Sequence, residues 1–155
     1  MNKPQSLESR LKEVLTEGTW VTGTNFRKQI TETTFKAATT EVYGLNSIAK
    51  LTFHIHYYIA GVLQVLEGGP LTIKDQLSFD APPITSDEDW QKLINQYNTD
   101  AKKFIDLVAN LSDKQLKENF VKEEYGDYER NINVLIEHTY YHLGQIAIIK
   151  KLVKQ

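Results

Sequence analysis

Residues 138–151, HTYYHLGQIAIIKK, place two histidines four positions apart in a segment otherwise rich in leucine and isoleucine. Residues four apart in an α-helix lie on one face, so His138 and His142 can converge on one point. Apolar residues around them recur at helical spacing, which predicts one core-facing ridge of Leu135, His138, His142, Ile146, Ile149 and Val153. Two imidazoles in such a ridge are costly unless something pairs their ring nitrogens. The stretch therefore predicts a long helix, from about Arg130 to Val153, with a polar site on its buried face.

The same helical spacing recurs in three other segments. A first helix is expected from Leu7 to Leu15, and a second from about Asn46 to Glu67, with Asn46 or Ser47 as its N-cap. A third opens at Ser86, where Asp89 completes a capping box, and continues to Val108. Four long amphipathic helices predict an all-α fold: a four-helix bundle with longer crossover connections, in a single domain over residues 1–155.

The connecting segments are less regular. Residues 31–44, TETTFKAATTEVYG, are rich in threonine and are compatible with either a strand or a frayed helix. Residues 71–85, LTIKDQLSFDAPPIT, form a loop too long for a simple turn, which indicates either a functional segment or a packed cover. Residues 112–120 read as a short helical turn, and residues 121–132 as a polar connector.

Composition narrows the classes of function. The formal net charge of −2, with basic residues scattered, gives no electrostatic footprint for nucleic acid or an anionic membrane. The chain has no cysteine, so any metal site must use histidine, aspartate or glutamate. No apolar run is long enough to span a membrane, and the first residues, MNKPQSLESRLKEV, lack the apolar region of a signal peptide. We therefore expect a cytoplasmic protein.

All four histidines fall on two predicted helices, with His54 and His56 on the second. A third donor from that helix would complete a three-histidine site with an open position, the pattern of catalytic zinc or a related divalent ion. Periodicity places His54 and His56 on opposite flanks of their apolar stripe, so either could reach inward. In the other interpretation, each imidazole bonds a carboxylate or carbonyl of another helix, or the ridge lies in water. The pattern is not HExxH, so a thermolysin-like mechanism has no support.

Two stretches, FHIHYYIAGVLQVLEGG at 53–69 and IEHTYYHLGQIAIIKK at 136–151, resemble the signature helices of the DinB-like superfamily of metal-binding four-helix bundles. The resemblance runs from about Leu7 to Val153. Its most specific part is the HxxYHxGQI pattern, matched by His138, Tyr141, His142, Gly144, Gln145 and Ile146. It implies that His54, His138 and His142 hold a divalent cation, with zinc or nickel preferred, and that His56 is displaced from the site.

The resemblance also suggests what the site does. Members of the superfamily include YfiT-like hydrolases and bacillithiol- or mycothiol-dependent transferases, which implies a divalent-metal-dependent hydrolase or low-molecular-weight thiol transferase with a small-molecule substrate. No separate general base is evident in the sequence. The alternatives are a non-enzymatic metal- or ligand-binding stress-response bundle and a plain helical interaction protein with solvated histidines. A homodimer is expected by resemblance and from the general frequency of two-fold oligomers.

Residues beside the histidines carry further expectations. Glycine in a helix interior is costly, and close approach of a neighbouring helix is the expected reason for Gly144. Gln145 is expected to bond another helix or subunit, or to contact a metal-bound water. The neighbouring tyrosines are expected to pack with their hydroxyls at the wet edge, and they are Tyr57, Tyr58, Tyr140 and Tyr141.

Overall fold

The computed structural model describes residues 2–153, which fold into seven α-helices and two short 3-10 helices. Within that range the only β-type pairing is an isolated bridge between Asn119 and Asp127, so the all-α prediction is confirmed. No helix among these residues is both long and apolar enough to cross a membrane. In chain order the helices are α1 (Lys3–Leu15), α2 (Phe26–Thr31), α3 (Phe35–Thr39), α4 (Ile48–Leu66), η1 (Asp75–Leu77), α5 (Asp87–Ala109), α6 (Asp113–Leu116), η2 (Glu123–Tyr125) and α7 (Tyr128–Leu152).

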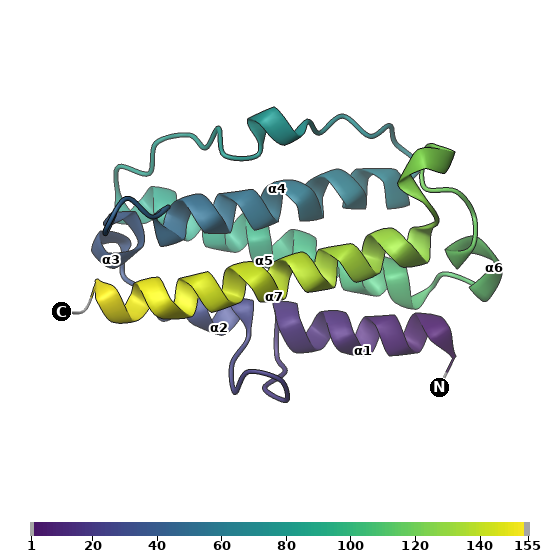
Figure 1. The fold of residues 1–155 in the computed structure, drawn as a ribbon, viewed down its shortest axis with the longest axis horizontal. Helices are drawn as coiled ribbons and strands as arrows, with labels where there is room; N and C mark the ends of the chain where they lie inside the picture. The colour runs from purple at the N-terminus through teal and green to yellow at the C-terminus, as the bar shows by residue number, and fades with distance from the viewer. Residues whose placement is uncertain (1, 154–155) are drawn as a thin grey trace.

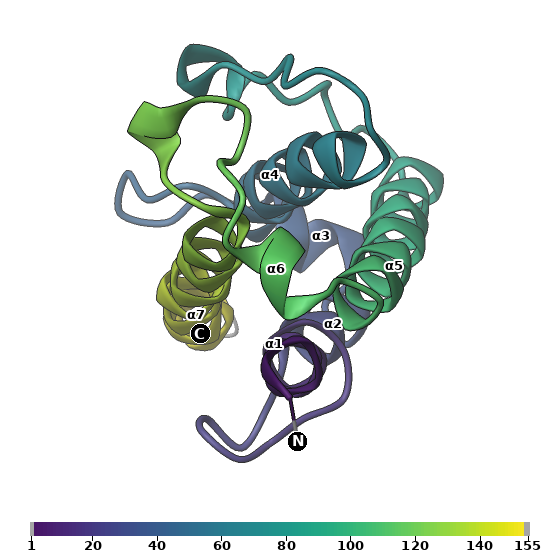
Figure 2. The ribbon, with the colours of Figure 1, turned by 90° about the vertical axis from the view of Figure 1, so that its right-hand side faces the viewer.

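The four long helices enclose the hydrophobic core. Helix α4 packs against α5 and α7, and α1 packs against the same two helices from the opposite side (Figures 1 and 2). Trp90 and Tyr97 of α5 are fully buried, and each satisfies its polar atom with a backbone carbonyl. Trp90 Nε1 donates to Thr33 O at 2.8 Å, and Tyr97 Oη donates to Leu15 O at 2.9 Å. These bonds fix α5 to the N-terminal third of the chain.

Side-chain caps explain where the helices begin. The capping box of Ser86 and Asp89 is present, as predicted, and Ser47 rather than Asn46 caps α4. Helix α1 begins at Lys3, earlier than the expected Leu7, because Asn2 and Gln5 form a capping box. Helix α7 begins inside the expected polar connector, because the Asp127 side chain accepts a bond from the Arg130 amide.

The two segments that the sequence left undecided are now defined. Within residues 31–44 the chain forms the short helix α3, which Thr34 caps, and not a strand. Residues 71–85, which we call the strap, run along α4 with η1 near their middle, as the teal segment in Figure 1 shows. The strap is a packed segment, because a Cβ atom placed on Gly61 of α4 would lie 2.5 Å from Ile73 Cγ2.

Gly144 differs from this arrangement. A Cβ atom placed there would meet no atom within 4 Å among the described residues, and Gly144 lies on the exposed face of α7. The expectation that a neighbouring helix approaches Gly144 is therefore wrong for this part of the structure. Of the helix-interior glycines that the structure describes, Gly61 is the one with a close neighbour, and that neighbour is Ile73 of the strap.

Candidate metal centre

Three histidines meet between α4 and α7. His138 Nε2 lies 3.1 Å from His54 Nε2 and 2.8 Å from His142 Nε2, and the three nitrogens lie within 4.8 Å of one another. His54 and His142 are only 5% and 6% exposed, and His138 is partly buried. The structure therefore brings together the three histidines predicted as ligands. None of them is a solvated surface residue.

His56 points elsewhere, although it lies only two residues beyond His54. Its Nε2 lies 2.7 Å from Oδ2 of Asp100 on α5. Residues two apart on a helix differ in direction by about 200°, so the two imidazoles emerge on opposite sides of α4. His56 thus follows the other interpretation of the sequence, an imidazole bonded to a carboxylate across the helices.

Hydrogen bonds at Nδ1 fix the tautomers of two histidines in the cluster. His54 Nδ1 lies 3.1 Å from the Ser78 carbonyl oxygen, and His142 Nδ1 lies 2.6 Å from Gln145 Oε1. Both oxygens can only accept, so each Nδ1 carries the proton and each Nε2 presents a lone pair to the cluster. Metal-binding histidines commonly donate their other ring N–H in this way.

Gln145 makes a contact that the sequence did not suggest. Among the described residues it bonds no other helix; its amide oxygen accepts from His142 on the same helix. Residues three apart on a helix are neighbours on its surface, which is why this contact is available. The spacing of His142 and Gln145 was the signal in the sequence that could have identified this pair. A bond to another subunit and a contact with a metal-bound water stay predictions.

Burial keeps the histidine cluster neutral. Burial, followed by the proximity of His142 and His54, lowers the pKa of His138 to about 4. Burial also lowers the pKa of His54, and the pKa of His142 falls for the same reason although its bond to Gln145 acts in the opposite direction. At neutral pH the three imidazoles are therefore in the form that binds metal.

The geometry and the donor chemistry both fit a divalent cation. Because His54 and His142 both turn lone pairs inward, one proton on His138 Nε2 can satisfy only one of its two close neighbours. A cation would satisfy all three. Ligand nitrogens of a tetrahedral zinc site lie about 3.3 Å apart, close to the two separations observed.

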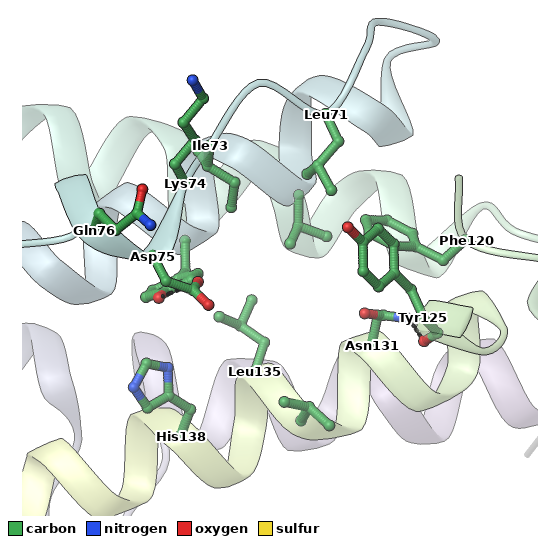
Figure 3. Close-up of a pocket in the computed structure, with 13 residues that line it drawn as sticks. Leu71, Ile73, Lys74, Asp75, Gln76, Phe120, Tyr125, Asn131, Leu135 and His138 are labelled. Atoms are coloured by element: carbon green, nitrogen blue, oxygen red, sulfur yellow. Dashed lines mark hydrogen bonds between the residues drawn. The ribbon is translucent and has the colours of Figure 1, made fainter. Parts of the chain in front are cut away.

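A pocket of about 620 Å³ opens beside the cluster, between α4, the strap and α7. His138 forms part of its wall, so one side of the histidine cluster faces this space (Figure 3). Asp75 of the strap also lines the pocket, and its Oδ1 accepts from Tyr58 Oη at 2.9 Å. Burial raises the pKa of Tyr58, which keeps this hydroxyl protonated as a donor. The other residues around the pocket are Val62, Leu71, Ile73, Lys74, Gln76, Phe120, Tyr125, Asn131, Val134 and Leu135.

Sequence reasoning missed the contribution of the strap. Ser78 and Phe79 both contact His54, the first through its carbonyl and the second by a ring stacked at 3.9 Å between centroids. Asp75 supplies the pocket with a carboxylate, where the sequence showed no separate general base. The length of residues 71–85 was the only sign in the sequence that this segment had a role.

The four neighbouring tyrosines divide into three groups. Tyr140 is partly buried and packs against the hydrophobic core. Tyr57 and Tyr58 place their hydroxyls on the strap, at Lys74 and Asp75. Tyr141 is largely exposed and its ring meets His142 edge-on, with 4.9 Å between centroids.

Comparison with known proteins gives one finding. The sequence model of the DinB superfamily matches residues 17–146, which includes all of α4 and the part of α7 that carries His138 and His142. A search of curated proteins and a search of solved structures found no match. The matched range covers most of the chain, and the three clustered histidines fit a metal-binding protein. The chain belongs to the DinB superfamily.

Proposed function

We propose that this protein is a divalent-metal-dependent enzyme that acts on a small molecule through His54, His138 and His142. The proposal includes a DinB-type four-helix bundle, made of α1, α4, α5 and α7 with longer crossover connections. One observation carries the proposal. His138 of the histidine cluster lines a pocket that is large enough for a small molecule. A structural metal site is usually closed on all sides by protein ligands, whereas a catalytic one keeps a position open.

The chain's own residues have distinct roles in this proposal. Ser78 and Gln145 hold the Nδ1 protons of His54 and His142, so both Nε2 atoms stay available. Asp75, held by the Tyr58 hydroxyl, offers a proton acceptor within the pocket. A bound divalent cation would polarise a substrate carbonyl and favour the deprotonated form of water or of a thiol. Apolar side chains supply much of the remaining wall of the pocket.

The charge of the pocket favours hydrolysis of a small amide or ester. Apart from His138, the pocket wall contains one basic side chain, Lys74, and one acidic side chain, Asp75. Their charges cancel, so the wall is close to neutral. A low-molecular-weight thiol with several carboxylates would need more cationic partners than one lysine. A thiol transferase is the second candidate, because the same histidine cluster would lower the pKa of a thiol once a cation is bound.

The test begins with the metal content of protein purified without a chelator or a metal-affinity resin. About one divalent ion per chain is expected, and zinc and nickel are the ions we propose. Small esters, amides and thiol–acceptor pairs are then tested with loaded protein, with chelator-treated protein and with His138→Ala. Turnover that needs both the ion and His138 supports the enzyme. Tight ion binding with no turnover across the panel favours the non-enzymatic metal- or ligand-binding stress-response protein.

Three further expectations from the sequence stay predictions: a single domain over residues 1–155, a homodimer and a cytoplasmic location. Met1, Lys154 and Gln155 lie outside the described residues. Sedimentation analysis of the loaded protein measures the oligomeric state directly.

A further inference from the structure

The strap covers one face of α4, and that face carries the metal-site residue His54. His54, Tyr57, Tyr58 and Gly61 follow one another at helical spacing and share a side of the helix. Each of the four contacts the strap. These four contacts fix the position of the strap along this face of α4.

Two strap residues act directly on His54. The Ser78 carbonyl oxygen lies 3.1 Å from His54 Nδ1, and the Phe79 ring stacks on the imidazole with 12° between the planes. Ser78 is itself held in place, because its Oγ donates to the Asp75 carbonyl at 2.7 Å across η1. The hydrogen bond selects the tautomer of His54, and the stacked ring limits rotation of the imidazole.

The strap is attached to α4 on the next turn of the helix. Tyr57 Oη donates to the Lys74 carbonyl at 3.1 Å and accepts from the Lys74 amide at 2.8 Å. Tyr58 Oη donates to Asp75 at 2.9 Å. These bonds place η1, and with it the Ser78 carbonyl, over His54.

Gly61 allows the strap to come this close. A Cβ atom at position 61 would lie 2.5, 2.6 and 2.9 Å from three side-chain carbons of Ile73. Carbon atoms in van der Waals contact lie about 3.5–4.0 Å apart, so an alanine would push Ile73 and the strap away from the helix. Glycine in a helix interior lowers helix stability, and here its position matches the path of the strap.

We propose that the strap is the positioning element of the metal centre. It holds His54 as the Nδ1–H tautomer with Nε2 directed at His138 and His142, and the contact of Gly61 with Ile73 sets its distance from α4. Only the part of the inference that concerns metal binding rests on the proposed function. The tautomer of His54 is a property of the metal-free chain.

The first arm of the experiment uses metal-free protein labelled with ¹⁵N-histidine, at about pH 7.5, above the ordinary histidine pKa of about 6.5. NMR distinguishes the two neutral tautomers. We expect His54 to be the Nδ1–H form in the unaltered chain and a mixture in Gly61→Ala. The double variant Gly61→Ala/Ile73→Ala removes the clash and should restore the Nδ1–H form. Gly144→Ala is the matched control, because within the described part of the chain a Cβ at that interior helix position meets no atom of another element within 4 Å.

The second arm measures zinc affinity by competition with a chelating dye. Loss of a group that orients a ligand costs about 10–100-fold in metal affinity, so Gly61→Ala should weaken binding by that factor and the double variant should regain most of it. If Gly61→Ala does not fold, Phe79→Ala replaces it, because that side chain is already 42% exposed and its loss removes only the stacked ring.

The outcomes separate the two proposals. A changed tautomer with no zinc binding in any sample supports the strap's action on His54 and overturns the metal centre. An unchanged tautomer and unchanged affinity in Gly61→Ala overturns the positioning role. Where Gly61→Ala is unfolded, unchanged zinc affinity in Phe79→Ala overturns it, because that variant keeps the Ser78 carbonyl and loses only the stacked ring. A loss in Gly61→Ala that Ile73→Ala fails to reverse in a folded protein also overturns it, since the clash would not be the cause.

Discussion

His54 and His56 lie two residues apart on α4, and their surroundings give them different chemistry. His54 faces two other imidazoles, and a carbonyl fixes its Nδ1 proton. His56 faces a carboxylate, that of Asp100, at 2.7 Å. An imidazole beside a carboxylate can form an ion pair, whereas imidazoles that turn lone pairs toward one another can share a cation. The comparison teaches that the direction of a histidine on its helix decides its role.

Removing a ligand is the strongest way to break this comparison. We expect His54→Ala and His142→Ala to abolish stoichiometric zinc or nickel binding, because two imidazoles cannot replace three. His56→Ala should keep about one ion per chain. Elemental analysis of the three variants, with circular dichroism to show that each is folded, checks this. Retention of one ion per chain by His142→Ala would contradict the site.

The residues that orient the ligands should matter less than the ligands themselves. Gln145→Ala frees the Nδ1 of His142 and should cost about 10–100-fold in zinc affinity, measured by dye competition. The carboxylate of Gln145→Glu can still accept from Nδ1 and should retain most of the affinity. Glu137→Ala, at an exposed position of the same helix, is the control. Equal affinities in all three variants would show that the bond to Gln145 does not support the site.

Acid tests the histidine cluster in the metal-free protein. The pKa of His138 is about 4 in the folded chain and about 6.5 when unfolded, so between these values the unfolded chain binds more protons. The free energy of unfolding should therefore fall as the pH falls from about 6.5 toward 4. Urea unfolding between about pH 5 and 6.5, in chelator, avoids the range where carboxylates titrate.

His138→Gln should flatten this dependence. The glutamine replaces the imidazole whose pKa is lowered by burial. The pair of His56 and Asp100 is unaltered in this variant. A slope that persists unchanged in His138→Gln would assign the effect to other groups.

The helices could be predicted from the sequence because their signals are local. Leu135, His138 and His142 repeat at helical spacing, and Ser86 with Asp89 marks the start of a helix within four residues. The start of α1 could also have been predicted, because Asn2 and Gln5 have the spacing of a capping box. The apolar pattern alone places this start later. Local spacing was therefore enough to predict the long helices and the paired histidines on α7.

The remaining parts of the site depend on contacts between distant residues. Ser78 reaches His54 from 24 positions along the chain, and no periodic pattern in the strap indicates that contact. The choice between His54 and His56 needed knowledge of the neighbours of α4, because periodicity places both beside the apolar stripe. The resemblance pointed to His54, whereas the path of the strap and the position of Asp100 became visible only in the structure.

The smallest expected effect concerns the other histidine. Asp100→Asn keeps a hydrogen-bond acceptor for His56 but removes the charge, and both side chains are partly exposed. Exposed ion pairs contribute about 0–1 kcal/mol, so the free energy of unfolding should fall by less than about 1 kcal/mol. Zinc affinity should stay unchanged, because His56 points away from the cluster. A clear loss of affinity in Asp100→Asn would show that α5 helps to orient α4 at the metal centre, and the sharp division between the two histidines would then fail.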